Sequence, residues 1–410
     1  MKVITRKDEK TREAGEWKIL TGNHAVSYAA KLARVQVVPA YPITPQTTIV
    51  ELISELIASG EMNARMIRVE SEHSAMAAAI GASAVGARVF TATASQGLLL
   101  MHEMLHWAAG SRTPVGMAVV NRAVGPPWNI HADHQDAISQ RDTGWIISFV
   151  SSNQEALDTV ITLYKVAEHP EVLLPFMVCL DGFVLSHTYM PVYLPPQDKI
   201  DEFLPPYDPP HWKLDPSNPI SFGALVLPNQ PYQEMRWSIH RSMEKALELF
   251  EKYSKEYGEL FDLKHGGAIE EYGAEDAEYL IITAGTIASE AEVAVDEMRK
   301  NGKKVGLLKI RLYRPFPSNT IIRELKGRKG AIVLDRSISF GLSGPISEDV
   351  RAVLHSFNID TPVVAYVTGL GGRDITYADI ENMVSRGISL IEEGKTPLIL
   401  WYKMRRFEKW

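Results

Sequence analysis

The sequence predicts an α/β protein built from two parallel-sheet domains. Short apolar runs alternate with helical patterns through the first two hundred residues, and the same alternation returns from about residue 275. The chain has 410 residues, of which 45% are hydrophobic and 23% charged, so it is long enough for two domains with well-buried cores. We therefore expect one domain at 1–200, a linker with a charged helix at 201–270, and a second domain at 271–410.

The first domain is predicted as a series of strands and helices in alternation. Strands are expected near 35–42, 66–70, 87–94, 115–121, 145–150 and 172–180, with helices near 45–59, 72–86, 96–109 and 153–168. Residues 192–235 are rich in proline, which favours a crossing linker and not a core. A charged helix is expected to follow at about 236–261.

The second domain repeats the pattern. Its expected strands are EYLIITAG, KKVGLLKI, GAIVLDR and PVVAYVTGL, with helices at about 288–300, 318–326 and 344–356.

Composition excludes several classes of protein. The net charge of −7, without a basic stripe, argues against nucleic-acid binding. No apolar run approaches the ~20 residues of a membrane span, and the charged N-terminal stretch lacks a signal core, so we expect a cytoplasmic protein. Cys179 is the only cysteine, which excludes an internal disulfide, a thiolate zinc site and an iron–sulfur cluster with its usual ~4 cysteine ligands. No metal site is expected on this chain.

Four unusual segments follow strands of the first domain, where ligands bind in open α/β sheets. They are Ile43-Thr44-Pro45, Glu70-Ser71-Glu72-His73, Ser95-Gln96-Gly97 and the strand end at Arg122. Taken singly, Thr44, Ser71 and Ser95 are interpreted as helix N-caps, and Glu72 suits a helix N-terminus. Arg122 is harder to explain structurally, because its planar fork among small and apolar neighbours needs an anionic partner such as a carboxylate or phosphate.

Several long motifs, in order along nearly the whole chain, resemble the alpha subunit of pyruvate- and 2-ketoisovalerate:ferredoxin oxidoreductases. They are YPITP from Tyr41, VESEHSAMAAAIGASAVGARVFTATASQGLLLM, NRAVGPPWNIHADHQDAISQRDTGW, YRPFP at 313–317, SFGLSG and GLGGRD at 369–374. The resemblance implies a domain that binds the pyrimidine end of thiamine diphosphate, a proline-rich linker and a transketolase C-terminal-like domain. It also implies oxidative decarboxylation of a 2-oxoacid to acyl-CoA and CO2.

The resemblance also implies roles for individual residues. Glu72 matches the glutamate that hydrogen-bonds the aminopyrimidine ring, where a carboxyl in a dry site helps to deprotonate the thiazolium carbon. Arg122 matches the arginine that grips the 2-oxoacid carboxylate, and Pro42 and Thr44 match the loop against cofactor and substrate. The expected catalytic residues are thus Glu72, Arg122 and Thr44, and the same three with Pro42 are the expected cofactor-binding residues.

The chain is expected to work only inside a complex, because it has no Gly-Asp-Gly stretch to hold the diphosphate through Mg²⁺. The resemblance assigns Mg²⁺ and the diphosphate to a beta subunit, and [4Fe-4S] clusters to partner subunits of beta, gamma and delta type. Ferredoxin, or NAD through an added flavin subunit, would accept the electrons. Candidate substrates are CoA with pyruvate, branched-chain or aryl 2-oxoacids such as phenylglyoxylate, and indolepyruvate. The run Pro126-Pro127-Trp128 resembles the ketoisovalerate branch.

Alternative interpretations remain for some motifs. His102-Glu103-Met104-Leu105-His106 matches the H-E-x-x-H pattern of zinc proteases, although no third ligand is evident, and a catalytically silent scaffold subunit is a further alternative. His131 and His134 are expected to satisfy a polar loop and not to bind a metal. The GGRD stretch at 371–374 could bind an anion through its backbone or form a tight turn, and the family resemblance favours a functional interface. Trp128 could line the substrate pocket or anchor its loop.

Overall fold

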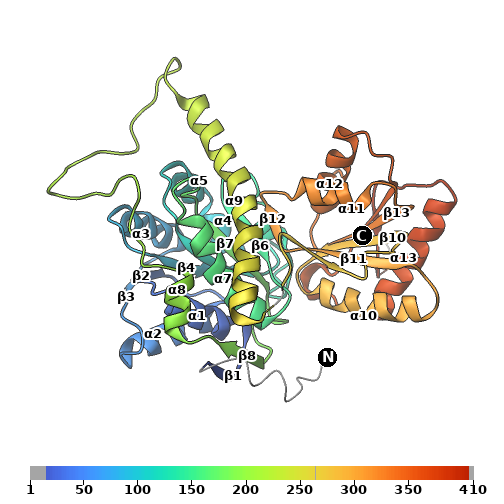
Figure 1. Cartoon of the computed structure of the whole chain (residues 1–410), viewed down its shortest axis with the longest axis horizontal. Helices are drawn as coiled ribbons and strands as arrows, with labels where there is room; N and C mark the ends of the chain where they lie inside the picture. The colour runs from blue at the N-terminus through green and yellow to red at the C-terminus, as the bar shows by residue number, and fades with distance from the viewer. Residues whose placement is uncertain (1–14, 264, 406–410) are drawn as a thin grey trace.

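The computed structural model describes residues 15–263 and 265–405, which form two α/β halves lying side by side (Figure 1). The first half runs from blue to yellow in the figure, and the second half, in orange and red, carries the C-terminal part of the chain. The two predicted α/β units are therefore present.

The first half is built on a sheet whose spatial order differs from the chain order. A five-stranded sheet runs β12-β6-β7-β5-β4, and one parallel bridge between Val37 and Val89 joins it to the pair β2-β3. The strands are β2 (Val37–Ala40), β3 (Arg65–Arg68), β4 (Phe90–Thr93), β5 (Gly116–Asn121), β6 (Ile146–Phe149), β7 (Phe176–Asp181) and β12 (Leu312–Arg314). Every residue of β5 and β7 is buried, as is usual for central parallel strands covered on both faces. Only β12 is antiparallel to its neighbour.

Helices cover both faces of this sheet. They are α1 (Gly22–Leu32), α2 (Thr47–Ala58), α3 (Glu72–Ala84), α4 (Ser95–Leu100), α5 (His102–Gly110), α6 (Gln135–Ile138), α7 (Asn153–Ala167), α8 (Gln197–Phe203) and α9 (Tyr232–Phe261). Ser71 caps α3 as predicted, because its hydroxyl accepts the N–H of Ser74 at 3.2 Å. The N-cap assignment of Thr44 was wrong, because a turn follows it and α2 starts only after Gln46. Ser95 is not a cap either, since it is the first helical residue of α4.

The proline-rich segment 192–235 divides into two parts. Its beginning belongs to β8 (Met190–Leu194), which pairs antiparallel with β1 (Glu16–Leu20), and α8 then buries Ile200 and Phe203 in the core of the first half. The prediction that none of this segment enters a core was therefore wrong for its first part. Residues 205–231 have no helix or strand and project from the body in Figure 1. The long α9 then packs along α7 of the first half.

The second half contains a six-stranded sheet of order β15-β14-β13-β10-β11-β9. Its strands are β9 (Ile269–Tyr272), β10 (Tyr279–Ala284), β11 (Val305–Ile310), β13 (Gly330–Asp335), β14 (Val363–Val367) and β15 (Leu400–Trp401). Its helices are α10 (Ile287–Lys300), α11 (Ser318–Leu325), α12 (Pro345–Ser356) and α13 (Tyr377–Glu392), with a short 3₁₀ turn, η2, at Leu370–Gly372. The antiparallel β9 and the helix α13 were not predicted, and the other strands except β15 fall within three residues of the expected bounds.

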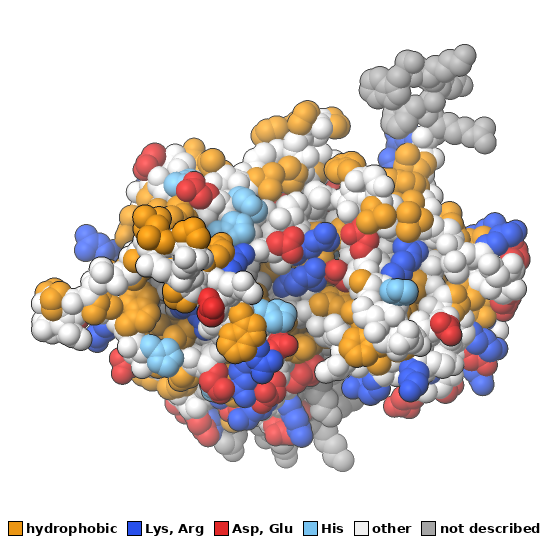
Figure 2. All heavy atoms as spheres, turned by 90° about the horizontal axis from the view of Figure 1, so that it is seen from above, with side chains coloured by type: hydrophobic (Ala, Val, Ile, Leu, Met, Phe, Trp, Pro, Cys, Tyr) orange, Lys and Arg blue, Asp and Glu red, His pale blue; other side chains and the backbone are white. Residues whose placement is uncertain are grey.

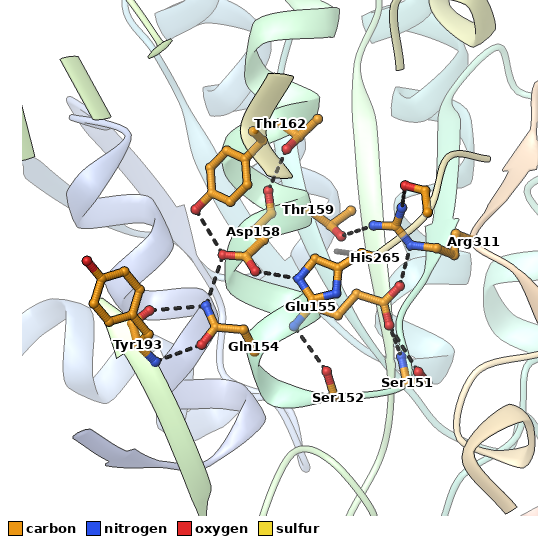
Figure 3. A network of polar contacts seen from close by, with 12 residues as sticks. Ser151, Ser152, Gln154, Glu155, Asp158, Thr159, Thr162, Tyr193, His265 and Arg311 are labelled. Atoms are coloured by element: carbon orange, nitrogen blue, oxygen red, sulfur yellow. Dashed lines mark hydrogen bonds and ion pairs between the residues drawn. The ribbon is translucent and has the colours of Figure 1, made fainter. Parts of the chain in front are cut away.

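The two halves share a strand and a buried polar network. β12 follows β11 of the second sheet but completes the edge of the first. Beside it, Glu155 of α7 accepts from Arg311 at 2.5 Å (Figure 3). Glu155 also pairs with Lys309 at 3.0 Å. Asp158, one turn further along α7, contacts His265 at 2.6 Å. We call Glu155, Asp158, His265, Lys309 and Arg311 the interdomain network.

The surface of the described part carries charges of both signs. Figure 2 shows Lys and Arg side chains next to Asp and Glu across the viewed face, with hydrophobic groups between them. Within residues 15–263 and 265–405, no helix is both long enough and apolar enough to cross a bilayer.

Candidate active site

The predicted residues meet along one edge of the first sheet. The carboxyl ends of β3, β2, β4 and β5 are neighbours there, because β2 joins β4 through the Val37–Val89 bridge. The segments that leave these ends bring together side chains that are far apart in the sequence. We call Glu72, Thr93, Gln96, Arg122 and Asp136 the strand-end site.

Glu72 opens α3, and only 6% of its surface is exposed. Its carboxylate faces Gly97 at the start of α4. A Cβ atom added to Gly97 would lie 2.4 Å from Glu72 Oε1 and 2.6 Å from Thr93 Oγ1, so a larger residue does not fit there. Thr93 Oγ1 is buried without a hydrogen-bond partner within the described residues. Buried polar atoms without partners are costly, so they mark a place where a ligand could supply the partners.

Arg122 follows β5 and is 2% exposed. Its Nη1 donates to the backbone oxygen of Thr44 at 2.7 Å, and its Nη2 donates to Gln96 Oε1 at 3.0 Å. Nε is buried without a partner in the described part of the chain. Burial lowers the pKa of the Arg122 guanidinium, and the nearby Asp136 opposes this shift. The side chain is thus a buried cation with no carboxylate bound to its fork, which suits an anionic ligand.

Thr44, Pro42 and Trp128 lie at the mouth of this edge. Thr44 and Pro42 are exposed, and Thr44 contributes its backbone oxygen to Arg122. The indole ring of Trp128 lies over the Arg122 guanidinium at 4.9 Å, yet 77% of the tryptophan is exposed. Such exposure is not what a packed loop anchor would show. The structure therefore brings together Glu72, Arg122 and the Thr44 loop, and Pro42 precedes Thr44 by two residues in that loop.

Asp136 was not identified from the sequence, although it belongs to the quoted HADHQD run. It is fully buried and accepts four N–H donors: the backbone of Ser95, Arg122 and Ala137, and the side chain of Asn121. Burial raises its pKa to about 6, and the hydrogen bonds oppose the rise. A polar residue in a long motif gives no sign of which backbone groups it will meet, so the sequence alone could not have found this role.

The two histidines of the same run have structural partners. His134 contacts Asp181 at 2.7 Å, and Asp181 pairs with Arg336 of the second half at 3.1 Å. Burial alone would raise the pKa of Asp181, but Arg336 and His134 hold it well below its ordinary value. His131 is exposed, and its ring lies 5.0 Å from that of Phe183 in a tilted arrangement. The polar-loop interpretation is confirmed for His134.

The GGRD stretch is a contact between the halves. Gly371 donates its N–H to Asp133 at 3.2 Å, and Gly372 donates to the backbone oxygen of Ala132 at 2.8 Å. Asn129 donates in turn to the oxygen of Gly371 at 2.9 Å. These amides are already used, so the turn interpretation fits better than an anion site.

The protease motif lacks a complete ligand set. The rings of His102 and His106 lie 5.0 Å apart, and His102 Nδ1 contacts Gln140 Oε1 at 2.6 Å. Among the described residues, no group of three or more His, Cys, Asp or Glu side chains is arranged to hold a metal ion. Cys179 is buried in β7, and burial raises the pKa of its thiol well above the ordinary value.

Two known families match most of the chain. Residues 28–255 match the family described as "Pyruvate flavodoxin/ferredoxin oxidoreductase, thiamine diP-bdg". Residues 277–380 match "Pyruvate:ferredoxin oxidoreductase core domain II". The strand-end site lies inside the first match.

Individual proteins are similar over nearly the full length. The ketoisovalerate oxidoreductase subunit VorA of Pyrococcus horikoshii is 47% identical over 390 residues, which cover 95% of this chain and 98% of that protein. The pyruvate synthase subunit PorA of Methanocaldococcus jannaschii is 46% identical over 392 residues, with the same coverage of 95% and 98%.

A solved structure with a similar fold is the 2-oxoglutarate:ferredoxin oxidoreductase from Magnetococcus marinus, which has 2-oxoglutarate, coenzyme A and succinyl-CoA bound. The TM-score is 0.71 at 22% identity over 91% of this chain, and the chain spans 65% of the length of that one. At this identity the likeness concerns the fold alone. The two family matches and the relatives confirm the resemblance seen in the sequence. The chain belongs to the alpha subunits of the thiamine diphosphate-dependent 2-oxoacid:ferredoxin oxidoreductases.

Proposed function

We propose that this chain supplies the pyrimidine-facing half of a thiamine diphosphate site, in a complex that oxidatively decarboxylates a 2-oxoacid. One observation carries the proposal: Glu72 is buried beside the unpartnered Thr93 Oγ1, on the same sheet edge as the buried Arg122. A carboxylate and a guanidinium that lack complementary charged partners are a poor way to stabilise a fold. They suit two ligands, a cofactor with a ring nitrogen near Glu72 and a substrate with a carboxylate near Arg122.

The residues present fit the pyrimidine end of the cofactor. Because Gly97 has no Cβ atom, the space next to the Glu72 carboxylate stays open. Thr93 Oγ1 is free to form a hydrogen bond with a ligand. When bound, thiamine diphosphate supplies the carbon nucleophile and the electron sink for the decarboxylation. Glu72 holds a proton at the ring nitrogen of the aminopyrimidine, and the dry environment excludes water from this carboxylate.

Arg122 binds the substrate carboxylate. Its Nη groups donate hydrogen bonds to two neutral oxygens, those of Thr44 and Gln96. A carboxylate, which shares its negative charge over two oxygens, can replace them. Thr44 and Pro42 are proposed to face cofactor and substrate, since both are exposed and the backbone oxygen of Thr44 contacts Arg122. These assignments support pyruvate, branched-chain and aryl 2-oxoacids equally, because all share the carboxylate.

The reaction needs groups that this chain does not carry. The 2-oxoacid loses CO2 and two electrons, and its acyl group passes to the thiol of CoA, so an acceptor must take the electrons. Cys179 is the only cysteine and is fully buried, which supports clusters on partner subunits of beta, gamma and delta type. The beta subunit is proposed to hold Mg²⁺ and the diphosphate. Ferredoxin, or NAD through a flavin subunit, is the proposed acceptor, and the cytoplasm is the proposed location.

The test uses the complex purified with its partner subunits. CoA-dependent reduction of a viologen dye is measured with pyruvate, 2-ketoisovalerate and phenylglyoxylate, and at least one acid is expected to support it. The chain purified alone is expected to contain no iron. Dye reduction by none of the acids, with thiamine diphosphate bound, would contradict the reaction, and iron in the isolated chain would contradict the division among subunits.

A further inference from the structure

Asp136 is a buried carboxylate that joins two segments of the strand-end site. Its Oδ2 accepts the backbone N–H of Ser95 at 2.9 Å and that of Arg122 at 3.0 Å. Its Oδ1 accepts the side-chain amide of Asn121 at 2.8 Å and the backbone N–H of Ala137 at 2.8 Å. Within the described residues it forms no ion pair, so its partners are these four donors.

The first of these contacts fixes an unusual turn. Ser95 has a φ of +48°, in the left-handed region that costs a residue with a side chain roughly 1 kcal/mol or more. Ala94, the N-cap of α4, offers no side-chain cap, and the carboxylate of Asp136 takes the Ser95 N–H in its place. The next two residues are Gln96, which meets Arg122, and Gly97, which faces Glu72. A shift of this turn would therefore move both neighbours.

The second contact fixes the backbone from which the guanidinium extends. The N–H of Arg122 is held by the same oxygen that holds Ser95, while the side chain reaches the Thr44 oxygen and Gln96. One carboxylate oxygen thus sets the spacing between the segment facing Glu72 and the segment carrying Arg122. All four of its partners are N–H donors. An amide or a protonated acid at this position would therefore point an N–H or O–H group at one or more of these donors, which cannot accept it.

We infer that Asp136 is a positioning residue, which sets the geometry of Glu72 toward the cofactor and of Arg122 toward the substrate through the Ser95 and Arg122 backbone amides. The inference rests on the proposed function of the strand-end site. Asp136 itself does not touch the reacting atoms.

The test compares Asp136→Asn with Asp133→Asn in the purified complex. Asp133 is a second buried carboxylate of the same loop, but it binds the N–H groups of Gln135 and Gly371 and touches neither Ser95 nor Arg122. Two quantities are measured: hydrogen–deuterium exchange at the thiazolium C2 of bound cofactor, and the KM for the 2-oxoacid. Asp136→Asn should slow the exchange and raise KM together, each by roughly 10- to 100-fold, because small misplacements are costly in an oriented site. Asp133→Asn should leave both near wild type.

A second variant separates the Ser95 contact from the Arg122 contact. Glycine adopts positive φ freely, so adding Ser95→Gly to Asp136→Asn should recover part of the exchange rate but not the KM. If Asp136→Asn does not assemble, Asn121→Ala removes one donor only and should move both quantities by a smaller factor. The melting temperature of each complex checks that it is folded.

The outcomes are distinct. Wild-type exchange and KM in Asp136→Asn, or in Asn121→Ala where that variant is needed, would overturn the inference, and so would equal losses in Asp133→Asn. No recovery by Ser95→Gly would overturn the role of the turn. Failure of the proposed function is seen separately, because the wild-type complex would then turn over none of the acids.

Discussion

Two buried polar clusters in this chain both contain Glu, Asp and Arg side chains, but they differ in how their atoms are paired. In the interdomain network, Glu155 pairs with Arg311 and Asp158 contacts His265 (Figure 3). Glu155 also pairs with Lys309. No atom of these five side chains is among the buried polar atoms without a partner, within the residues that the structure describes. In the strand-end site, by contrast, Thr93 Oγ1 and Arg122 Nε lack partners within the same residues.

The comparison teaches that burial of charge does not by itself identify a functional site. Both clusters contain a carboxylate exposed by 6% or less, in Glu72 and Glu155. What separates them is complementarity: a satisfied network stabilises a fold, and an incomplete one is kept where a ligand completes it. The next experiments test whether the first cluster controls stability and the second controls chemistry.

The largest expected effect is on the strand-end site. Glu72→Gln should slow C2 hydrogen exchange in the bound cofactor by ~10²–10⁴-fold, because the amide cannot hold the proton that the carboxylate holds. Glu70→Gln is the matched control, since Glu70 is exposed and bonds only Ser74 in the described chain. Exchange is followed by NMR after acid quench. Wild-type exchange and turnover in Glu72→Gln would instead favour the catalytically silent scaffold.

Substitutions in the interdomain network should lower the free energy of unfolding of the protein. Glu155→Gln leaves Arg311 buried without a carboxylate, while Lys309 keeps its pair with Glu270. The loss should lower the free energy of unfolding by about 3–5 kcal/mol. Glu297→Gln breaks an exposed pair with Lys300 and should cost at most about 1 kcal/mol. Urea midpoints measure both. Equal midpoints for the two variants would contradict the structural role of the network.

The same network predicts a pH dependence. Burial alone would raise the pKa of Glu155, but Lys309 and Arg311 hold it far below its ordinary value of about 4.3. A carboxylate with a lowered folded pKa stabilises the fold above its unfolded pKa, and this stabilisation is lost as the pH falls below about 4.3. The gap in urea midpoint between wild type and Glu155→Gln should therefore narrow on going from pH 7 to pH 4. A constant gap would show that Glu155 is not the titrating group.

The sequence predicted the regular parts of the fold well, and the reasons are local. Buried parallel strands such as β5 and β13 are continuous apolar runs, and Ser71 is a cap that needs only its own turn. It missed what depends on distant partners: β12, which leaves its own half to join β6, and α8, whose few apolar residues fill the first core. The division at residues 200 and 270 stays a prediction.

For the site too, residues with a local signal could be predicted and residues that depend on distant partners could not. Glu72 and Arg122 could be selected because they stand at strand ends, and because their motifs match a family. Asp136 could not, since its importance lies in the backbone amides of Ser95 and Arg122, and a pattern of side chains does not contain that information.

A smaller effect is expected for Arg122→Lys. Lysine keeps the charge but cannot present two parallel donors to a carboxylate, and the loss of a charge-assisted hydrogen bond costs about 1.5–3 kcal/mol. KM should rise by roughly 10- to 100-fold for pyruvate, 2-ketoisovalerate and phenylglyoxylate alike. Arg112→Lys is the control, because Arg112 is partly buried but bonds Ser242 and Val172, away from the site. A loss confined to one acid would assign Arg122 to side-chain selection.

The smallest effect, and the one that bears on substrate choice, is expected at Trp128. Its ring lies over Arg122 at 4.9 Å and 77% of it is exposed, so it contributes little to the packing of the loop. Trp128→Ala should therefore leave the melting temperature nearly unchanged. If the indole borders the variable group of the substrate, its removal should change the ratios of kcat/KM among the three acids. The change in each ratio should correspond to about 1–3 kcal/mol, enough to alter the order of the acids.

Trp107→Ala controls for the loss of an exposed indole, because Trp107 lies on α5 and is 50% exposed. The values of kcat/KM for the three acids are measured on both variants, with melting temperatures alongside. A uniform fall for all acids together with a lower melting temperature would restore the loop-anchor interpretation. A uniform fall at constant melting temperature would mean that the indole acts only through the Arg122 cation, where an exposed cation–π contact contributes about 0.5–1 kcal/mol. Only a changed order, in Trp128→Ala and not in Trp107→Ala, makes this residue a determinant of substrate choice.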